Sequence, residues 1–142
     1  MFNRTRRLRG SQLIRDMVKN VDFSMDNLVY PLFIEEGTGI KKEITSMKGQ
    51  FRFSIDMLKE ELEELKELGV KSLLLFGIPK EKDCLGSEAY NDNGIIQEAI
   101  RYIKREFPNF LIITDVCLCE YTSHGHCGVL KGEELLNDET LV

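Results

Sequence analysis

The sequence lacks several features that would place it in a class at once. It has no excess of basic residues, since its net charge is -5 at pH 7, whereas a general nucleic-acid binder is usually basic overall. No apolar run approaches the roughly 18 residues that span a membrane. The basic N-terminus, MFNRTRRLRGSQ, is not followed by the apolar stretch of a secretory signal. These absences favour a cytoplasmic protein that binds neither nucleic acid nor membrane.

A glycine-rich phosphate loop is also missing. Neither GxGxxG nor a Walker-type motif follows the first predicted strand, which argues against a nucleotide-binding domain. The 142 residues are 42% hydrophobic and 30% charged, which is typical of one globular domain. Thiols stay reduced in the cytoplasm, so the four cysteines indicate metal binding or catalysis rather than a disulfide framework.

Residues 1–27 are predicted to form an N-terminal arm. Four arginines lie near its start, and a short helix with Ser11 as a possible N-cap follows them. We expect these arginines to be solvated or to contact another subunit. They are Arg4, Arg6, Arg7 and Arg9.

The remaining residues, 28–142, are predicted to alternate strands with helices. Three apolar runs predict buried strands, at residues 28–34, 71–78 and 110–116, although Pro31 interrupts the first. The alternation predicts a parallel sheet with right-handed crossovers. Two α/β folds fit this order, an open doubly wound sheet or the start of a (β/α)8 barrel. Both gather their chemistry at the carboxyl ends of the strands.

Two amphipathic segments supply the predicted helices. The first begins at Ser54 and ends at Gly69, with leucines up to Leu68 on its inner face. The second has Asn93 as its expected N-cap. Short edge strands are possible between the first strand and the first helix, and Asp138 resembles the N-cap of a helix near the end of the sequence.

The segment DVCLCEYTSHGHCG holds three of the four cysteines. Cys117 and Cys119 point to the same side if the strand continues through them, and Asp115 joins that side if the strand runs so far. A turn at Gly125 would then return Cys127 to the other two. Three thiolates can hold Zn²⁺ and leave its fourth position for water or substrate, as in catalytic zinc sites.

Other uses of these residues stay open. A purely structural zinc site would need a fourth protein ligand, from His124, His126 or Cys84. Cys117 and Cys119 could instead form a redox dithiol, or the thiols could be buried without a ligand. One histidine could orient the loop from outside the metal's own ligands.

The cysteine segment closely resembles the zinc-binding segment of the porphobilinogen synthase family, also called 5-aminolevulinate dehydratase. The same likeness extends to RTRRLR, LVYPLFI and LLLFGIPKEKDCLGSEAYNDNG, in order along the chain. The resemblance implies a (β/α)8 barrel with an arm that wraps a neighbouring subunit, in a homo-octamer. It implies condensation of two 5-aminolevulinate molecules to porphobilinogen, with loss of water, in haem and tetrapyrrole biosynthesis.

The resemblance also assigns residues. Cys117, Cys119 and Cys127 match the zinc ligands, and Asp115 matches an active-site aspartate in a supporting role. Any allosteric Mg²⁺ would be bound outside these residues. The Schiff-base lysines of the family lie on later strands, so we expect this chain to be an N-terminal fragment of about three β/α units that is inactive alone.

Overall fold

The computed structural model describes residues 5–141. The predicted solvent or subunit contact of Arg4 therefore lies outside the described residues. Among the described residues, no helix is both long and apolar enough to cross a membrane.

Five strands form one sheet in the order β2-β3-β1-β4-β5. β1 pairs in parallel with both β3 and β4, β4 pairs in parallel with β5, and β2 is antiparallel to β3. β1, β4 and β5 follow one another in one direction, as the strands of a barrel do, while the antiparallel pair of β2 and β3 lies on the other side of β1. The strands are β1 (Val29–Glu35), β2 (Lys41–Ile44), β3 (Met47–Phe53), β4 (Ser72–Ile78) and β5 (Leu111–Thr114).

Pro31 lies inside β1 without breaking the sheet. β4 pairs with β1 from Val29 to Glu35, but β3 pairs only with Phe33 and Ile34. The strand around Pro31 therefore has a ladder partner on one side only, which is where a residue without an N–H is tolerated.

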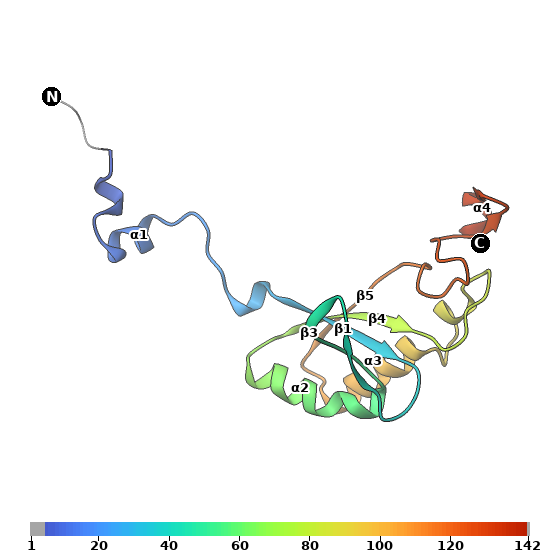
Figure 1. The fold of residues 1–142 in the computed structure, drawn as a ribbon. Coiled ribbons are helices and arrows are strands. Elements are labelled where there is room, and N and C mark those ends of the chain that lie inside the picture. The colour runs from blue at the N-terminus through green and yellow to red at the C-terminus, as the bar shows by residue number, and fades with distance from the viewer. Residues whose placement is uncertain (1–4, 142) are drawn as a thin grey trace.

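Two long helices, α2 (Leu58–Glu67) and α3 (Ile95–Glu106), cover the same face of the sheet (Figure 1). They bury the side chains of alternate strand residues, such as Leu32 and Ile34 in β1. Within the described residues the opposite face is uncovered: Phe33 and Phe76 stack there at 5.2 Å, and Ile113 is 38% exposed. Helices on one side only are the arrangement of a barrel wall.

The structure corrects three predicted details of the helices. Leu68 is 60% exposed, because it is the C-cap of α2 and the chain turns away at Gly69, whose φ is +82°. The N-cap of α3 is Gly94 rather than Asn93. The N-cap of α4 (Asn137–Thr140) is Leu136, so Asp138 lies inside that helix.

The N-terminal residues stand away from the sheet (Figure 1). They contain η1 (Arg7–Arg9), α1 (Gln12–Val18) and η2 (Met25–Asn27). The Ser11 side chain accepts a hydrogen bond from the Ile14 backbone N–H at 3.2 Å, which confirms it as an N-cap. That these residues form an arm on a neighbouring subunit stays a prediction.

The other short elements lie between or after these strands and helices. They are η3 (Ile55–Met57) before α2, η4 (Ser87–Ala89) before α3, and the antiparallel pair β6 (Leu130–Lys131) and β7 (Glu134–Leu135) near the C-terminus.

Truncation of a core leucine tests this packing. Leu62 in α2 is fully buried, so Leu62→Ala should lower the free energy of unfolding by about 2–5 kcal/mol, through lost burial and a residual cavity. Leu68→Ala is the matched control in the same helical segment and should cost less than about 1 kcal/mol. Urea denaturation followed by circular dichroism measures both, and equal losses would contradict this core.

Candidate metal centre

The cysteine segment begins where β5 ends. The strand stops at Thr114, so Asp115 is the first residue beyond it and is exposed. Cys117 and Cys119 therefore do not alternate along a strand, and the predicted reason for their convergence is wrong. A turn performs it instead, because the backbone N–H groups of Tyr121 and Thr122 both donate to the Leu118 carbonyl at 2.9 Å.

A second turn returns Cys127 to the first two cysteines. Gly125 has a φ of +74°, a left-handed conformation that glycine adopts without strain, as predicted from the sequence. The Thr122 hydroxyl donates to the His126 carbonyl at 2.8 Å and fixes this turn. The ligand atoms of Cys117, Cys119 and Cys127 all lie within 4.8 Å of one another.

The pKa values of Cys117 and Cys127 are shifted in opposite directions. The Leu118 backbone N–H donates to Cys127 Sγ at 3.1 Å and lowers the pKa of Cys127. Burial raises this pKa, but hydrogen bonds from the other two thiols lower it further. The Cys119 backbone N–H lowers the pKa of Cys117, but burial and the thiols of Cys119 and Cys127 raise that pKa to about 11. Cys127 therefore ionises before Cys117.

This donor set fits a soft divalent cation. Tetrahedral Zn²⁺ with sulfur ligands at roughly 2.3 Å places the sulfur atoms about 3.8 Å apart. This separation is compatible with the three sulfur atoms here, which all lie within 4.8 Å of one another. A cation also removes the repulsion between thiolates that keeps Cys117 protonated. Burial and the neighbouring thiols raise the pKa of Cys117, so this thiol would be the less reactive member of a redox dithiol.

No fourth protein ligand joins the group within residues 5–141. His124 Nδ1 accepts from the His126 backbone N–H at 3.2 Å, which leaves Nε2 to donate to the Cys84 carbonyl at 3.3 Å. Both ring nitrogens of His124 are thus used by the backbone. The convergent group contains neither His126 nor Cys84, so the closed structural site is not favoured.

The two residues that follow Cys119, Glu120 and Tyr121, lie against β4 at Gly77. The sequence did not predict this contact. Burial, and then the charge of Asp115, raise the pKa of Glu120, while the nearby Gly77 backbone lowers it. Tyr121 is buried, and burial raises its pKa to about 12. A Cβ at Gly77 would lie 2.6 Å from the Tyr121 hydroxyl. The glycine inside the apolar strand KSLLLFGI was the available signal, because such a glycine often marks a close approach.

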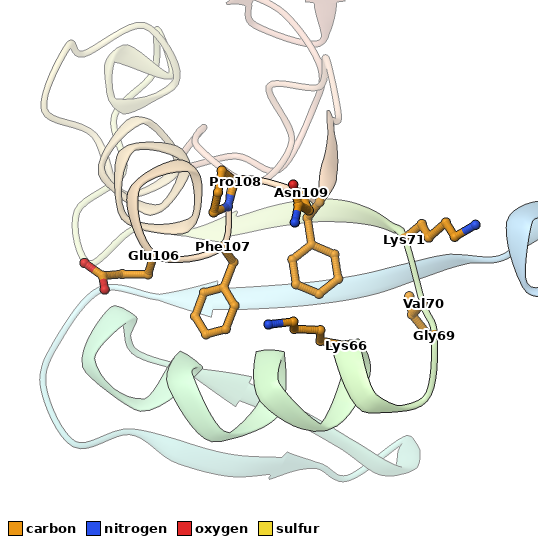
Figure 2. A pocket seen from close by; sticks show the side chains of 9 residues that line it. Lys66, Gly69, Val70, Lys71, Glu106, Phe107, Pro108 and Asn109 are labelled. Atoms are coloured by element: carbon orange, nitrogen blue, oxygen red, sulfur yellow. The ribbon is translucent and has the colours of Figure 1, made fainter.

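Open space borders the thiols. A hollow of about 610 Å³ is lined by His126 and Cys127 together with residues of the β6–β7 hairpin. Another hollow, of about 240 Å³, lies between the C-terminal ends of α2 and α3 (Figure 2). Phe107 and Lys66 line it, at the amino ends of the strands. Barrel enzymes carry their chemistry at the opposite ends, so the first hollow is the relevant one.

Comparison with known proteins identifies relatives along the whole chain. The family described as delta-aminolevulinic acid dehydratase matches residues 2–142. The protein of that name from Ruminiclostridium josui is 54% identical over 99% of this chain and 69% of its own length. That of Bacillus subtilis is 49% identical over 99% of this chain, and the chain spans 43% of its length.

A solved structure extends the comparison to the fold. The delta-aminolevulinic acid dehydratase (porphobilinogen synthase) of Toxoplasma gondii, in complex with the reaction product porphobilinogen, matches with a TM-score of 0.92 and 33% identity. The match covers 99% of this chain and 41% of that one. The fold is therefore the N-terminal part of a (β/α)8 barrel.

The thiol cluster predicts pH-dependent metal binding. Zn²⁺ must displace the protons that the thiols hold, so its affinity should fall as pH decreases from about 8 to about 6, on the order of tenfold per unit for each proton displaced. Competition with a chromophoric chelator measures this. Cys84→Ser, outside the cluster, should behave as the unchanged chain does, and an affinity that does not vary with pH would contradict the assignment.

Proposed function

Because the chain belongs to the delta-aminolevulinic acid dehydratase family, we propose that it is the N-terminal part of a porphobilinogen synthase. The whole protein would condense two 5-aminolevulinate molecules to porphobilinogen, with loss of water, in tetrapyrrole biosynthesis. The observation that carries this proposal is the convergence of three thiols at the carboxyl end of a barrel strand.

Cys117, Cys119 and Cys127 would be the zinc ligands. When bound, Zn²⁺ would supply a Lewis acid for a carbonyl or hydroxyl oxygen of the second substrate. The Leu118 N–H would keep Cys127 ionised and oriented toward the other two thiols. The hollow beside Cys127 supports an open side through which a substrate reaches the cluster.

Asp115 would play a supporting role. Its carboxylate is exposed at the end of β5, and its charge reaches Glu120 and Tyr121, since it contributes to raising the pKa of both. 5-Aminolevulinate carries an ammonium group, and a carboxylate at this position would attract and orient it.

The assembly and location are also proposals. The whole protein would be a cytoplasmic homo-octamer in which residues 1–27 lie on a neighbouring subunit. Exposed apolar side chains in that segment support this, with Leu13 82% and Met17 77% exposed. Residues 28–142 would be the first three strands and two helices of the barrel, and any allosteric Mg²⁺ would be bound outside them.

Cobalt substitution tests the metal centre. We expect Co²⁺ to give a thiolate charge-transfer band and a spectrum of three sulfur ligands with one exchangeable oxygen ligand. The variant with all three cysteines changed to serine should lose the band. A spectrum with a fourth sulfur or a nitrogen ligand would favour the structural zinc module instead.

An activity assay tests whether this part of the barrel is active alone. The 142-residue chain alone should form no porphobilinogen, because one face of its sheet is uncovered and the resemblance places the Schiff-base lysines on later strands. A full-length relative, such as the Bacillus subtilis protein, is the positive control. Turnover by the chain above a blank would contradict this expectation.

A further inference from the structure

The loop after β4 lies against the cysteine segment. We define the Asp83 loop as residues 83–87. Its Asp83 carbonyl accepts a hydrogen bond from the Ser123 backbone N–H at 2.8 Å, and Asp83 and Thr122 form an isolated parallel bridge. The neighbouring Cys84 carbonyl receives the Nε2–H of His124. The two loops that follow β4 and β5 are therefore joined through their backbones.

The Asp83 carboxylate organises this loop. Its Oδ1 accepts from the backbone N–H groups of Leu85 at 2.9 Å and Ser87 at 3.1 Å, and its Oδ2 accepts from the Ser87 hydroxyl. The Ser87 hydroxyl, followed by the Ser87 N–H, lowers the pKa of Asp83. One ionised side chain thus binds three donors of its own loop.

Gly86 brings the backbone of the Asp83 loop into contact with the cysteine segment. It is buried in a left-handed conformation, with a φ of +66°. A Cβ there would lie 3.3 Å from Leu118 Cδ2 and 3.4 Å from Thr122 Cγ2, so the loop backbone packs directly on the cysteine segment. Leu118 lies between Cys117 and Cys119 and donates its N–H to Cys127.

His124 forms the second connection. Its ring joins the Cys84 carbonyl to the His126 backbone N–H, one residue before Cys127. Any movement of the Asp83 loop therefore shifts both sides of the thiol cluster: Leu118 through Gly86, and the turn to Cys127 through His124.

We infer that Asp83 is a positioning residue for the thiol cluster, acting through the backbone of its own loop. The inference rests on the proposed metal centre. Bringing three thiolates together is opposed by their mutual repulsion, so a loop that holds them in place before the metal arrives raises its affinity. Asp83 is exposed, and water can satisfy the donors it releases, so its removal should affect the metal more than the fold.

Co²⁺ binding to the purified 142-residue chain tests this. Asp83→Ala should weaken Co²⁺ affinity by about tenfold or more, within the range for residues that orient metal ligands, and should broaden the thiolate charge-transfer band. Asp83→Asn keeps an oxygen acceptor for the two backbone donors and should recover most of the affinity. Competition with a chelator and the visible spectrum give both readouts.

Asp56→Ala is the matched control. Asp56 also accepts a backbone hydrogen bond, from Gly39 at 2.9 Å, and the Ser54 hydroxyl lowers its pKa. It lies in η3 after β3, however, and β1 and β4 separate β3 from β5 in the sheet. Its removal should leave Co²⁺ affinity unchanged. An equal loss of affinity in Asp56→Ala and Asp83→Ala would overturn the inference, because the effect would then be general.

The remaining outcomes separate this inference from the proposed function. If the unchanged chain has a folded circular dichroism spectrum and gives no charge-transfer band, the metal centre itself is wrong. If it gives the band and Asp83→Ala binds Co²⁺ equally well, only the positioning role is overturned. Should Asp83→Ala lose its native circular dichroism spectrum, Ser87→Ala decides instead: it removes one donor to the same carboxylate, and an unchanged affinity would overturn the role.

Discussion

Three thiols whose sulfur atoms lie within 4.8 Å of one another cannot all ionise unless a cation balances their charge. The local structure eases this for one of them, since Cys127 receives the N–H of Leu118. At Cys117, burial and the neighbouring thiols outweigh the Cys119 backbone N–H and raise the pKa to about 11. In the proposed metal centre a divalent ion would balance this charge, and the turns around the cysteines already hold the three sulfur atoms close together.

The parallel sheet supplies the foundation for that arrangement. β4 and β5 are hydrogen-bonded neighbours, so the loops that leave their carboxyl ends start side by side. Tyr121 packs against Gly77 near the end of β4, and the Asp83 loop is hydrogen-bonded to the same segment at Ser123. The cluster is thus held by two adjacent strand ends rather than by its own short segment.

The sheet also shows how the site relates to a larger barrel. The helices bury one face, while Phe33, Phe76 and Ile113 lie on the face that is uncovered within the described residues. Barrels fill that side with layers of side chains from all their strands. The proposed metal centre would therefore form from local elements, whereas the proposed substrate site would need residues contributed from around the barrel.

The sequence by itself determined the order of the buried strands and long helices along the chain, most of the inner face of both helices, and the set of clustered cysteines. Periodicity and residue chemistry are local properties, so a sequence can reveal them. Periodicity could not decide between a doubly wound sheet and a barrel, since the order of strands in a sheet depends on which strands pair. The family resemblance predicted the barrel, and the solved relative confirms it. The sequence misplaced Leu68 and Asn93, where single caps end or begin a helix. Only the tertiary structure showed that turns rather than strand alternation gather the thiols, and that Asp83 and Gly77 contact the cysteine segment at Ser123 and Tyr121. Those contacts join segments more than 30 residues apart, and no local pattern encodes them.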